Sequence, residues 1–354
     1  MNKKIVFTGG GTAGHVTPNI ALLPYLQKEG YDAFYIGSYN GIEKRLMEDF
    51  DIPYYGISTG KFRRYFDLKN LSDPFRVIKG YSQALKILKE LKPDIVFSKG
   101  GFVSVPVVRA AASLKIPCII HESDMTPGLA NKLCIPVATK VCCNFPETTK
   151  YVPSGKAVLT GSPIRTELTT GSKLAALELC GFTANKPVVM VIGGSQGAAS
   201  VNVMIREALP KLLEEFQVVH ICGKDKVDNL MLTIPGYKQF EYLKSDLKDV
   251  FAMADVVVSR AGANAICELL ALKKPNLLIP LQMGTRGDQI LNARSFEEQG
   301  FSMAVREDFI DCDILTEKIK ELYENRQTYI DKMCESNQIN SIPTILELIK
   351  EYSA

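Results

Sequence analysis

Short, continuous apolar runs rich in β-branched residues alternate with longer helical patterns along the chain. Continuous apolarity is what strands buried on both faces require, and helical segments between them predict right-handed βαβ crossovers and a parallel sheet. The pattern therefore predicts an α/β fold of the doubly wound kind. The apolar runs lie at 5–8, 33–36, 95–98, 118–121 and 141–143 in the first half, and at 188–192, 218–221, 256–259 and 276–279 in the second.

The same order of signals begins twice. Each half opens with a strand that runs directly into a Gly-rich turn, at 7–11 and at 191–195. We predict a boundary near 161–166 and two domains, 1–163 and 164–354, that face each other across a cleft, with the last helix able to pack back on the first domain. Ligands lie outside the carboxyl ends of the strands in such sheets, so both turns are expected to face the cleft.

Three Gly-rich turns follow predicted strands, at 9–15, 99–104 and 193–198. Glycine lets backbone N–H groups approach a ligand closely, and the helix that follows adds unpaired donors and a favourable dipole for anions. A purely structural βα turn is the alternative for any one of them. Three such turns in one chain favour the binding of anionic groups.

The first turn also has the spacing of a dinucleotide fingerprint, with Gly9, Gly11 and Gly14 as GxGxxG. A nicotinamide site needs an acidic residue at the end of the second strand, and that strand ends Ile36-Gly37-Ser38-Tyr39, without a carboxylate. A dehydrogenase is therefore disfavoured. The missing Walker A lysine pattern disfavours a nucleotide triphosphatase.

Composition and charge exclude further classes of protein. Forty-two Lys and Arg against 39 Asp and Glu leave a net charge of +3, which argues against a protein that coats nucleic acid but allows a local basic patch. Nine Cys without a CxxC pair or zinc-ligand spacing indicate free thiols in a reducing compartment. With no signal-peptide pattern and no apolar run of about 18 residues, we expect a cytoplasmic protein that does not cross a membrane.

Several ordered blocks resemble one family over nearly the whole chain, although the stretch after 300 matches only loosely. These blocks are 8–18, 99–106, 121–124, 127–132, 161–165, 193–198, 254–263, 288–289 and 292–293. In their order and composition they resemble the MurG family of GT-B glycosyltransferases, which move N-acetylglucosamine from UDP-GlcNAc onto lipid I to make lipid II for peptidoglycan. The resemblance implies two Rossmann-like domains, with UDP-GlcNAc held mainly by the second.

The resemblance also implies a donor site. Glu268 matches the position that binds the ribose hydroxyls, Ser195 the diphosphate site, and Gln289 a position that holds sugar hydroxyls. Arg165 and Leu243 lie where the family places uracil contacts. The remaining donor-site positions are Gly10, Gly11, Thr12, Asp124, Gln196 and Gly197. Asp124 stands where many relatives carry Asn, a change that keeps an acceptor but loses a donor.

His15 is the candidate general base for the acceptor hydroxyl, because an imidazole titrates near neutral pH. Capping of the helix or anchoring of an acceptor phosphate is the alternative role, and Glu122 is an alternative base. His121 has no clear role, and His220 is more typical of a strand residue with a satisfied hydrogen bond. The acceptor and its diphosphate are expected at Gly14, His15, Gly100 and Gly101.

No metal and no other cofactor are expected. Many glycosyltransferases hold a divalent ion with an Asp-x-Asp pair, and here 311–313 has that spacing but lies late in the chain between helical segments. We interpret it as turn or cap chemistry. The charge of the UDP leaving group must then be met by the helix N-terminus and the Ser195 turn, so activity is expected to survive EDTA.

Aromatic and basic residues interleave at 61–66 and 74–81. A lipid-linked acceptor is met at a bilayer surface, where each basic residue contributes about 1 kcal/mol toward anionic headgroups and aromatic rings lie at the interface. We therefore expect a peripheral protein on the cytoplasmic face of the membrane, with no nucleic-acid partner. An amphipathic helix packed on its own domain is the alternative. The expected membrane residues are Phe62, Arg63, Arg64, Phe75, Arg76, Ile78 and Lys79.

Two other functions stay open. Another UDP-sugar enzyme of the GT-B class, such as a glycolipid synthase or a UDP-GlcNAc 2-epimerase, would keep the Glu268 and Ser195 features but is not expected to share blocks 99–106 and 121–132. A non-catalytic UDP-sugar-binding protein would bind the nucleotide without turnover, and His15→Ala would then change nothing.

Overall fold

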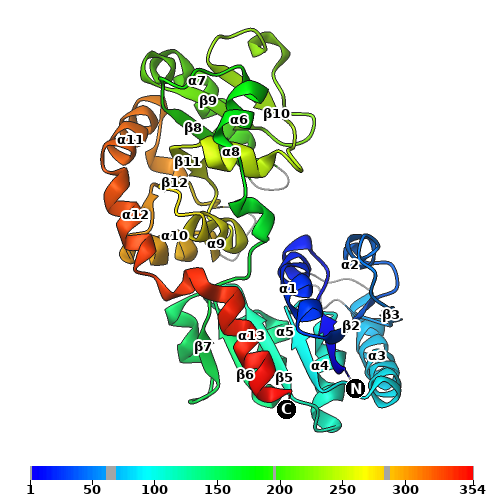
Figure 1. Ribbon diagram of the computed structural model, residues 1–354. Coiled ribbons are helices and arrows are strands. Elements are labelled where there is room, and N and C mark those ends of the chain that lie inside the picture. The colour runs from blue at the N-terminus through cyan, green and yellow to red at the C-terminus, as the bar shows by residue number, and fades with distance from the viewer. Residues whose placement is uncertain (1, 61–68, 194–196, 283–287, 354) are drawn as a thin grey trace. The chain divides into compact units, whose positions relative to one another are not determined.

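The computed structural model describes residues 2–60, 69–193, 197–282 and 288–353, which fold into two compact units (Figure 1). One unit comprises residues 1–165 together with 340–354, and the other comprises 166–339. Each unit is built on one parallel sheet, so the doubly wound α/β fold predicted from the sequence is confirmed.

The N-terminal unit has a seven-stranded sheet in the order β3-β2-β1-β4-β5-β6-β7. Its strands are β1 Lys3–Thr8, β2 Tyr31–Ser38, β3 Tyr54–Ile57, β4 Ile95–Ser98, β5 Cys118–Glu122, β6 Lys140–Cys143 and β7 Ala157–Leu159. Its helices are α1 Thr17–Lys28, α2 Ile42–Met47, α3 Lys69–Leu91, α4 Ser104–Ser113, α5 Leu129–Cys134 and α13 Ser341–Tyr352, with short 3-10 segments η1 Ala13–His15, η2 Ile135–Val137 and η3 Pro146–Tyr151.

Apolar residues on alternate sides of each strand build two cores in this unit. Ile5 and Phe7 of β1 face one side, where α1, α2 and α13 supply the apolar partners. Val6 faces the other side, where α3, α4 and α5 pack. Both faces of the sheet are therefore covered, which explains why its strands read as continuous apolar runs.

Helix α13 belongs to the N-terminal unit although it is the last helix of the chain (Figure 1). Ile345 and Ile349 are fully buried in the same core as α1. The Ser341 hydroxyl donates to the carbonyl of Ser162 at 2.9 Å, and the Tyr31 and Ser353 hydroxyls lie 2.6 Å apart. The C-terminal segment is thus tied to this unit by both apolar and polar contacts.

The C-terminal unit has a six-stranded sheet in the order β10-β9-β8-β11-β12-β13. Its strands are β8 Val188–Ile192, β9 Gln217–Ile221, β10 Tyr237–Phe240, β11 Val256–Ser259, β12 Asn276–Leu278 and β13 Met303–Ala304. Its helices are α6 Lys173–Cys180, α7 Ala199–Glu215, α8 Leu247–Met253, α9 Ala263–Ala271, α10 Asp288–Glu298, α11 Cys312–Glu324 and α12 Arg326–Cys334, with 3-10 segments η4 Thr166–Thr169, η5 Asn229–Met231, η6 Glu307–Phe309 and η7 Asn337–Asn340.

The strand order reverses direction at one point in each sheet. In the N-terminal unit β1 pairs with β4, with Thr8 opposite Ser98, and in the C-terminal unit β8 pairs with β11, with Ile192 opposite Ser259. Such a switch point leaves a crevice at the carboxyl ends of the two strands, where ligands of doubly wound proteins bind. All three Gly-rich turns leave the sheets at these two points.

Candidate active site

The Gly-rich turns at 9–15 and 99–104 interlock at the switch point of the N-terminal unit. The Lys99 N–H donates to the Thr8 carbonyl at 3.0 Å, which continues the β1–β4 ladder into the turns. Gly101 has φ +82°, and a Cβ atom there would collide with the Gly10 carbonyl and lie 3.2 Å from Nδ1 of His15. Only glycine allows this close approach. The predicted positions Gly10, His15 and Gly101 are thus brought together.

His15 ends the 3-10 turn that leads into α1, and its ring is half-buried. Its Nδ1 atom lies 3.0 Å from Oγ1 of Thr12. Burial and the charge of Lys99 lower the pKa of His15 to about 4, against a hydrogen bond with the Gly10 backbone and the charge of Glu43. Helix α1 begins without a side-chain cap, so its start does not depend on the imidazole. The ring is neutral at pH 7 and able to accept a proton.

Glu43 is a buried carboxylate at this site that sequence reasoning missed. It lies in the first turn of α2 and is fully buried. One oxygen accepts from the Ser38 N–H at 3.0 Å and from the Ser38 hydroxyl, and the other accepts from the Gly11 N–H at 3.2 Å. A Cβ atom at Gly10 would lie 2.6 Å from the carboxyl carbon. Glu43 therefore fixes the backbone of the first Gly-rich turn.

Tyr35 and Asn19 hold the same turn from below. The Tyr35 hydroxyl donates to the Gly9 carbonyl at 2.9 Å, and the Asn19 amide donates to the Thr8 carbonyl at 3.2 Å. Burial raises the pKa of Tyr35 well above its ordinary value, so its hydroxyl stays a donor. The turn is therefore preorganised from three elements, α1, α2 and β2.

A second buried network lies at the carboxyl ends of β4 and β5. The Lys99 ammonium is 2.7 Å from Nδ1 of His121 and donates to the Ser123 hydroxyl. The Nε2 atom of His121 lies 2.9 Å from the carbonyl oxygen of Gly161. Both ring nitrogens of His121 are engaged within the protein, and burial with the Lys99 charge holds its pKa well below the usual range. This geometry does not suit a base.

Glu122, the alternative base, organises the loop that follows β5. One of its oxygens accepts from the Asp124 N–H at 2.9 Å, and the other accepts from the Gly128 N–H at 3.1 Å and the Asn131 amide at 2.8 Å. Its side chain is 4% exposed, so the carboxylate faces the loop rather than solvent. These contacts favour a structural role. Asp124 itself is half-buried, and its backbone is held by Glu122 and Thr148.

The Gly-rich turn at 193–198 follows β8, at the switch point of the C-terminal unit. Ser195 and Gln196 fall outside the described residues, whereas Gly197 has φ +68°, and a Cβ there would collide with the Cys222 carbonyl. Helix α7 follows, and its N-cap residue, Ala198, makes no side-chain cap. The first N–H groups of α7 are therefore not used by a capping side chain.

Arg260 connects this turn to the rest of the C-terminal unit and was also missed. Its guanidinium binds Glu307 through both oxygens, at 3.0 and 3.2 Å, and donates to the Ser200 hydroxyl at 2.8 Å. A further bond of 3.0 Å reaches the Ile279 carbonyl. Burial acts to raise the pKa of Glu307, but hydrogen bonds from Arg260 and Ser200 outweigh it and hold that pKa below its ordinary value. Arg260 thus anchors the first turn of α7 to β11 and β12.

The remaining donor-site positions lie on different elements. Gln289 is in the first turn of α10, and its side-chain oxygen accepts from the Leu281 N–H at 3.0 Å. Glu268 is half-buried on α9, and Leu243 is half-buried between β10 and α8. Arg165 is half-buried and is the last residue of the first segment of the N-terminal unit.

His220 is a structural residue, as the sequence suggested. Its ring nitrogens lie 2.9 Å from the Tyr237 hydroxyl and 2.9 Å from the Asn202 side-chain oxygen. Burial and the charge of Arg206 lower its pKa to about 3. It is therefore a neutral, fully paired imidazole in the core of the C-terminal unit.

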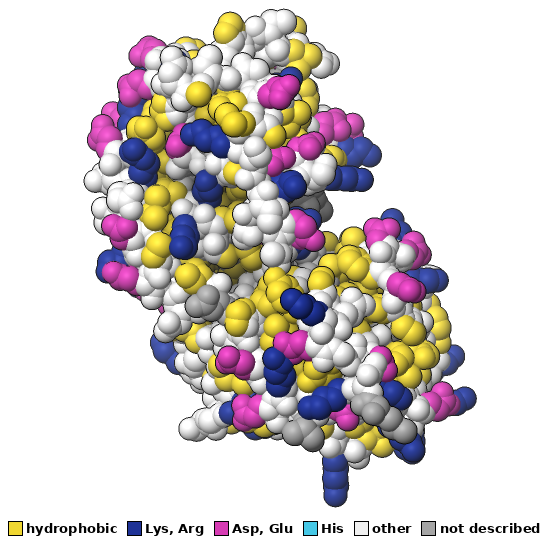
Figure 2. Space-filling model, viewed as in Figure 1, with side chains coloured by type: hydrophobic (Ala, Val, Ile, Leu, Met, Phe, Trp, Pro, Cys, Tyr) yellow, Lys and Arg dark blue, Asp and Glu magenta, His cyan; other side chains and the backbone are white. Residues whose placement is uncertain are grey.

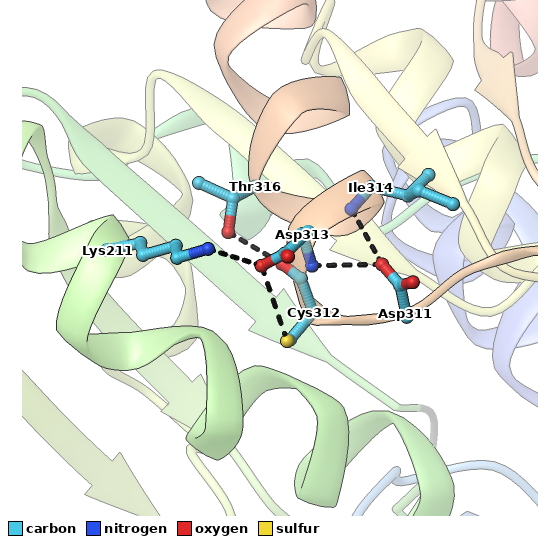
Figure 3. A network of polar contacts seen from close by, with 6 residues as sticks. All are labelled: Lys211, Asp311, Cys312, Asp313, Ile314 and Thr316. Atoms are coloured by element: carbon cyan, nitrogen blue, oxygen red, sulfur yellow. Dashed lines mark hydrogen bonds and ion pairs between the residues drawn. The ribbon is translucent and has the colours of Figure 1, made fainter.

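The Asp-x-Asp spacing at 311–313 is a helix cap, as predicted (Figure 3). Asp311 is the N-cap of α11 and accepts from the backbone N–H groups of Asp313 at 3.0 Å and Ile314 at 2.9 Å. Asp313 forms an ion pair with Lys211 at 2.5 Å. Across the described ranges, no group of three or more His, Cys, Asp or Glu side chains could hold a metal ion.

Of the predicted membrane residues, Phe62, Arg63 and Arg64 lie outside the described residues. The other four are on the first half of α3. Phe75 is 74% exposed and Ile78 63% exposed, and the neighbouring Arg76 and Lys79 are also exposed. On the face of each unit shown in Figure 2, basic and acidic side chains are interspersed, in line with the small net charge.

Comparisons with known proteins identify the family of this chain. Residues 5–143 match the glycosyltransferase family 28 N-terminal domain, and residues 188–349 match the C-terminal domain of the same family. The chain therefore belongs to glycosyltransferase family 28.

Several curated relatives carry one name, UDP-N-acetylglucosamine–N-acetylmuramyl-(pentapeptide) pyrophosphoryl-undecaprenol N-acetylglucosamine transferase. The protein of Lachnospira eligens is 64% identical and that of Lachnoclostridium phytofermentans 59% identical, each over 99% of both chains. Among solved structures, MurG of Acinetobacter baumannii superposes with a TM-score of 0.79 at 27% identity, over 99% of both chains. A UDP-GlcNAc 2-epimerase of Neisseria meningitidis has a TM-score of 0.67 at 16% identity, over 99% of this chain and 100% of its own, which shows a shared fold alone.

Proposed function

We propose that this chain transfers N-acetylglucosamine from UDP-GlcNAc to the C4 hydroxyl of the muramyl sugar of lipid I, which gives lipid II for peptidoglycan synthesis. The observation that carries the proposal is the identity of 64% and 59% over 99% of both chains with transferases of that name. The epimerase alternative is supported only by a shared fold at 16% identity.

The reaction is a single displacement with inversion. The acceptor hydroxyl oxygen forms the new bond to the anomeric carbon of the donor sugar while the bond from that carbon to the UDP oxygen breaks. The hydroxyl proton goes to Nε2 of His15, whose Nδ1 side is engaged by Thr12. A pKa of about 4 makes His15 a weak base in the free protein. An anionic acceptor diphosphate bound beside it raises that pKa toward neutrality and strengthens the base.

The N-terminal unit is proposed to hold the acceptor, with its diphosphate at the interlocked turns that contain Gly14, Gly100 and Gly101. Support comes from the interlocking of the two turns around Gly10 and Gly101 and from the buried carboxylate of Glu43 that holds the first turn rigid. Preorganised backbone donors bind a phosphate without a reorganisation cost at the moment of reaction.

The C-terminal unit is proposed to hold UDP-GlcNAc. The backbone at Gly197, the start of α7 and the Ser195 and Gln196 turn meet the diphosphate charge, so that no metal is needed. Glu268 accepts from the ribose hydroxyls, and Gln289 donates from its amide to the sugar.

The remaining donor-site residues are also proposed as ligand contacts. Arg165 and Leu243 are proposed to contact uracil. Gly10, Gly11, Thr12 and Asp124 are proposed to contact UDP-GlcNAc.

The first half of α3 is proposed as the membrane contact. The part of the chain that the structure describes contains no helix long and apolar enough to span a bilayer. Phe75 and Ile78 are exposed apolar side chains next to the basic side chains of Arg76 and Lys79, a combination that binds an anionic bilayer surface. The protein then works as a peripheral enzyme at the cytoplasmic face, where the lipid-linked acceptor is met.

Product analysis separates this function from its alternatives. The full chain is incubated with UDP-GlcNAc alone, and with UDP-GlcNAc and a lipid I analogue. Transfer predicts a disaccharide–lipid product and UDP only when the analogue is present. UDP and N-acetylmannosamine without any acceptor would instead establish an epimerase, and bound but unconverted UDP-GlcNAc in both mixtures would establish a binding protein.

A further inference from the structure

A lysine lies inside the protein directly after β4. Lys99 is 1% exposed, its ammonium is 2.7 Å from Nδ1 of His121, and it also donates to the Ser123 hydroxyl. Lysine is almost never fully buried unless specific partners hold it, because desolvation of its charge is costly. None of the binding or proton-transfer roles described above uses this side chain.

His121 takes the hydrogen bond from Lys99 as a neutral imidazole. Its Nε2 faces the Gly161 carbonyl at 2.9 Å, which can only accept, so Nε2 carries the proton and Nδ1 the lone pair. Nδ1 therefore accepts from the Lys99 ammonium.

Lys99 and His15 are joined through the two Gly-rich turns. A Cβ atom at Gly9 would lie 3.4 Å from Cβ of Lys99 and would collide with the His15 carbonyl, while a Cβ atom at Gly101 would lie 3.2 Å from Nδ1 of His15. The turn after β1 thus packs against Cβ of Lys99. The charged groups that act on the His15 ring are Lys99, from the end of β4, and Glu43, from α2.

We propose that Lys99 is a positioning residue for the transfer reaction: its buried ammonium fixes His121 and Ser123 at the carboxyl ends of the central strands and, together with burial, keeps the His15 imidazole neutral, so that Nε2 can take the proton of the attacking hydroxyl. This inference rests on the proposed role of His15 and names the group that controls its proton affinity. Burial is the largest cause of the lowered pKa of His15, and the charge of Lys99 is the second, because a nearby cation disfavours the imidazolium form.

Nuclear magnetic resonance can follow the protonation of His15 directly, because the chain has only three histidines. In the full chain labelled with ¹⁵N-histidine, the His15 signals are assigned by their loss in His15→Gln. We expect a His15 titration midpoint near 4 in the unmodified protein. Lys99→Met is expected to raise it by about one pH unit or more. Lys86→Met, the same substitution at an 81% exposed lysine of the same unit, is expected to leave it unchanged.

Two results overturn the inference: a midpoint near 6.5 in the unmodified protein, or an unchanged midpoint in a folded Lys99→Met variant. If Lys99→Met does not fold, Lys99→Gln replaces it, because its amide can still donate to His121 without carrying a charge. The shift of the midpoint in the folded variant then decides the question, and a midpoint near 6.5 in the unmodified protein overturns the inference with either variant.

The pH dependence of transfer is a second measurement, which would not change if Lys99 had a purely structural role. With a midpoint raised from about 4 to about 5, the neutral fraction of His15 at pH 5 falls from about nine-tenths to about one-half. The kcat/KM of Lys99→Met for a lipid I analogue should then fall about twofold between pH 8 and pH 5 relative to the unmodified protein. An equal loss at every pH would overturn the inference. Full transfer by His15→Gln would refute His15 as the base, while the titration would still decide the role of Lys99.

Discussion

Glu43 should determine the stability of the first Gly-rich turn, and Glu43→Gln tests this with little change in shape. The carboxylate accepts from the Ser38 N–H on one oxygen and from the Gly11 N–H on the other. A glutamine has one carbonyl oxygen, so its NH₂ group must face one of these two backbone donors. One buried N–H then loses its acceptor, which costs about 1–3 kcal/mol, and the remaining bond loses the strength that a charged acceptor gives.

We expect Glu43→Gln to lower the unfolding free energy of the N-terminal unit by about 2–3 kcal/mol. Far-UV circular dichroism follows the urea transition, since the chain has no tryptophan to report it by fluorescence. Hydrogen exchange at the Gly11 and Ser38 amides locates the effect, because both should exchange faster in the variant. Glu48→Gln, at an exposed position just after α2, is the matched control and should stay within about 0.5 kcal/mol.

Glu43→Gln should also shift the His15 pKa, in the direction opposite to the shift expected for Lys99→Met. The charge of Glu43 raises the pKa of His15, so its removal should move the His15 titration midpoint further down. Unchanged stability together with unchanged exchange at Gly11 and Ser38 would refute the role given to this carboxylate.

Three further predictions follow from other parts of the molecule. A lysine in place of Arg260 cannot keep both bonds to Glu307, so Arg260→Lys should lower the unfolding free energy of the C-terminal unit in urea by about 1–3 kcal/mol and raise the KM for UDP-GlcNAc. An unchanged KM would show that the first turn of α7 does not depend on Arg260. Replacing Phe75 and Ile78 together by serine should leave the unfolding free energy nearly unchanged, because both side chains are exposed. The double variant should bind anionic vesicles at least tenfold more weakly in a sedimentation assay. Equal vesicle binding would place the membrane contact elsewhere. His220 has a folded-state pKa of about 3, below its unfolded value near 6.5, so its stabilising effect is complete above pH 6.5 and is lost as the pH falls toward 3. The unfolding free energy, measured from pH 7 to pH 4, should therefore fall less steeply in His220→Gln than in the unmodified protein. Equal slopes would contradict this.

The strands most easily found in the sequence were those covered on both faces, because burial on both sides leaves a continuous apolar run. Edge strands carried no such signal. β3 has mostly half-buried residues, β10 alternates buried and half-buried positions over Tyr237–Phe240, and β13 is only two residues long. Their pairing depends on the neighbouring strand more than on their own composition.

Some parts of the site could be predicted from residues close together in the sequence, and others depend on contacts between residues far apart in it. The Gly-rich turns were found because strand, glycines and helix follow one another within a few residues. Glu43 lies 32 residues from Gly11, and Glu307 lies 47 residues from Arg260, so both contacts exist only in the folded chain. Lys99 stood inside a recognised motif, but lysines are mostly exposed, and nothing local indicated its burial.

The most direct test of the account is transfer of radiolabelled N-acetylglucosamine from UDP-GlcNAc to a lipid I analogue by the full chain, with and without EDTA. We predict the same yield of labelled lipid product in both reactions, because backbone donors and the start of α7 neutralise the leaving UDP. Product that disappears with EDTA would contradict the metal-free mechanism. No labelled lipid in either reaction would contradict the proposed function itself.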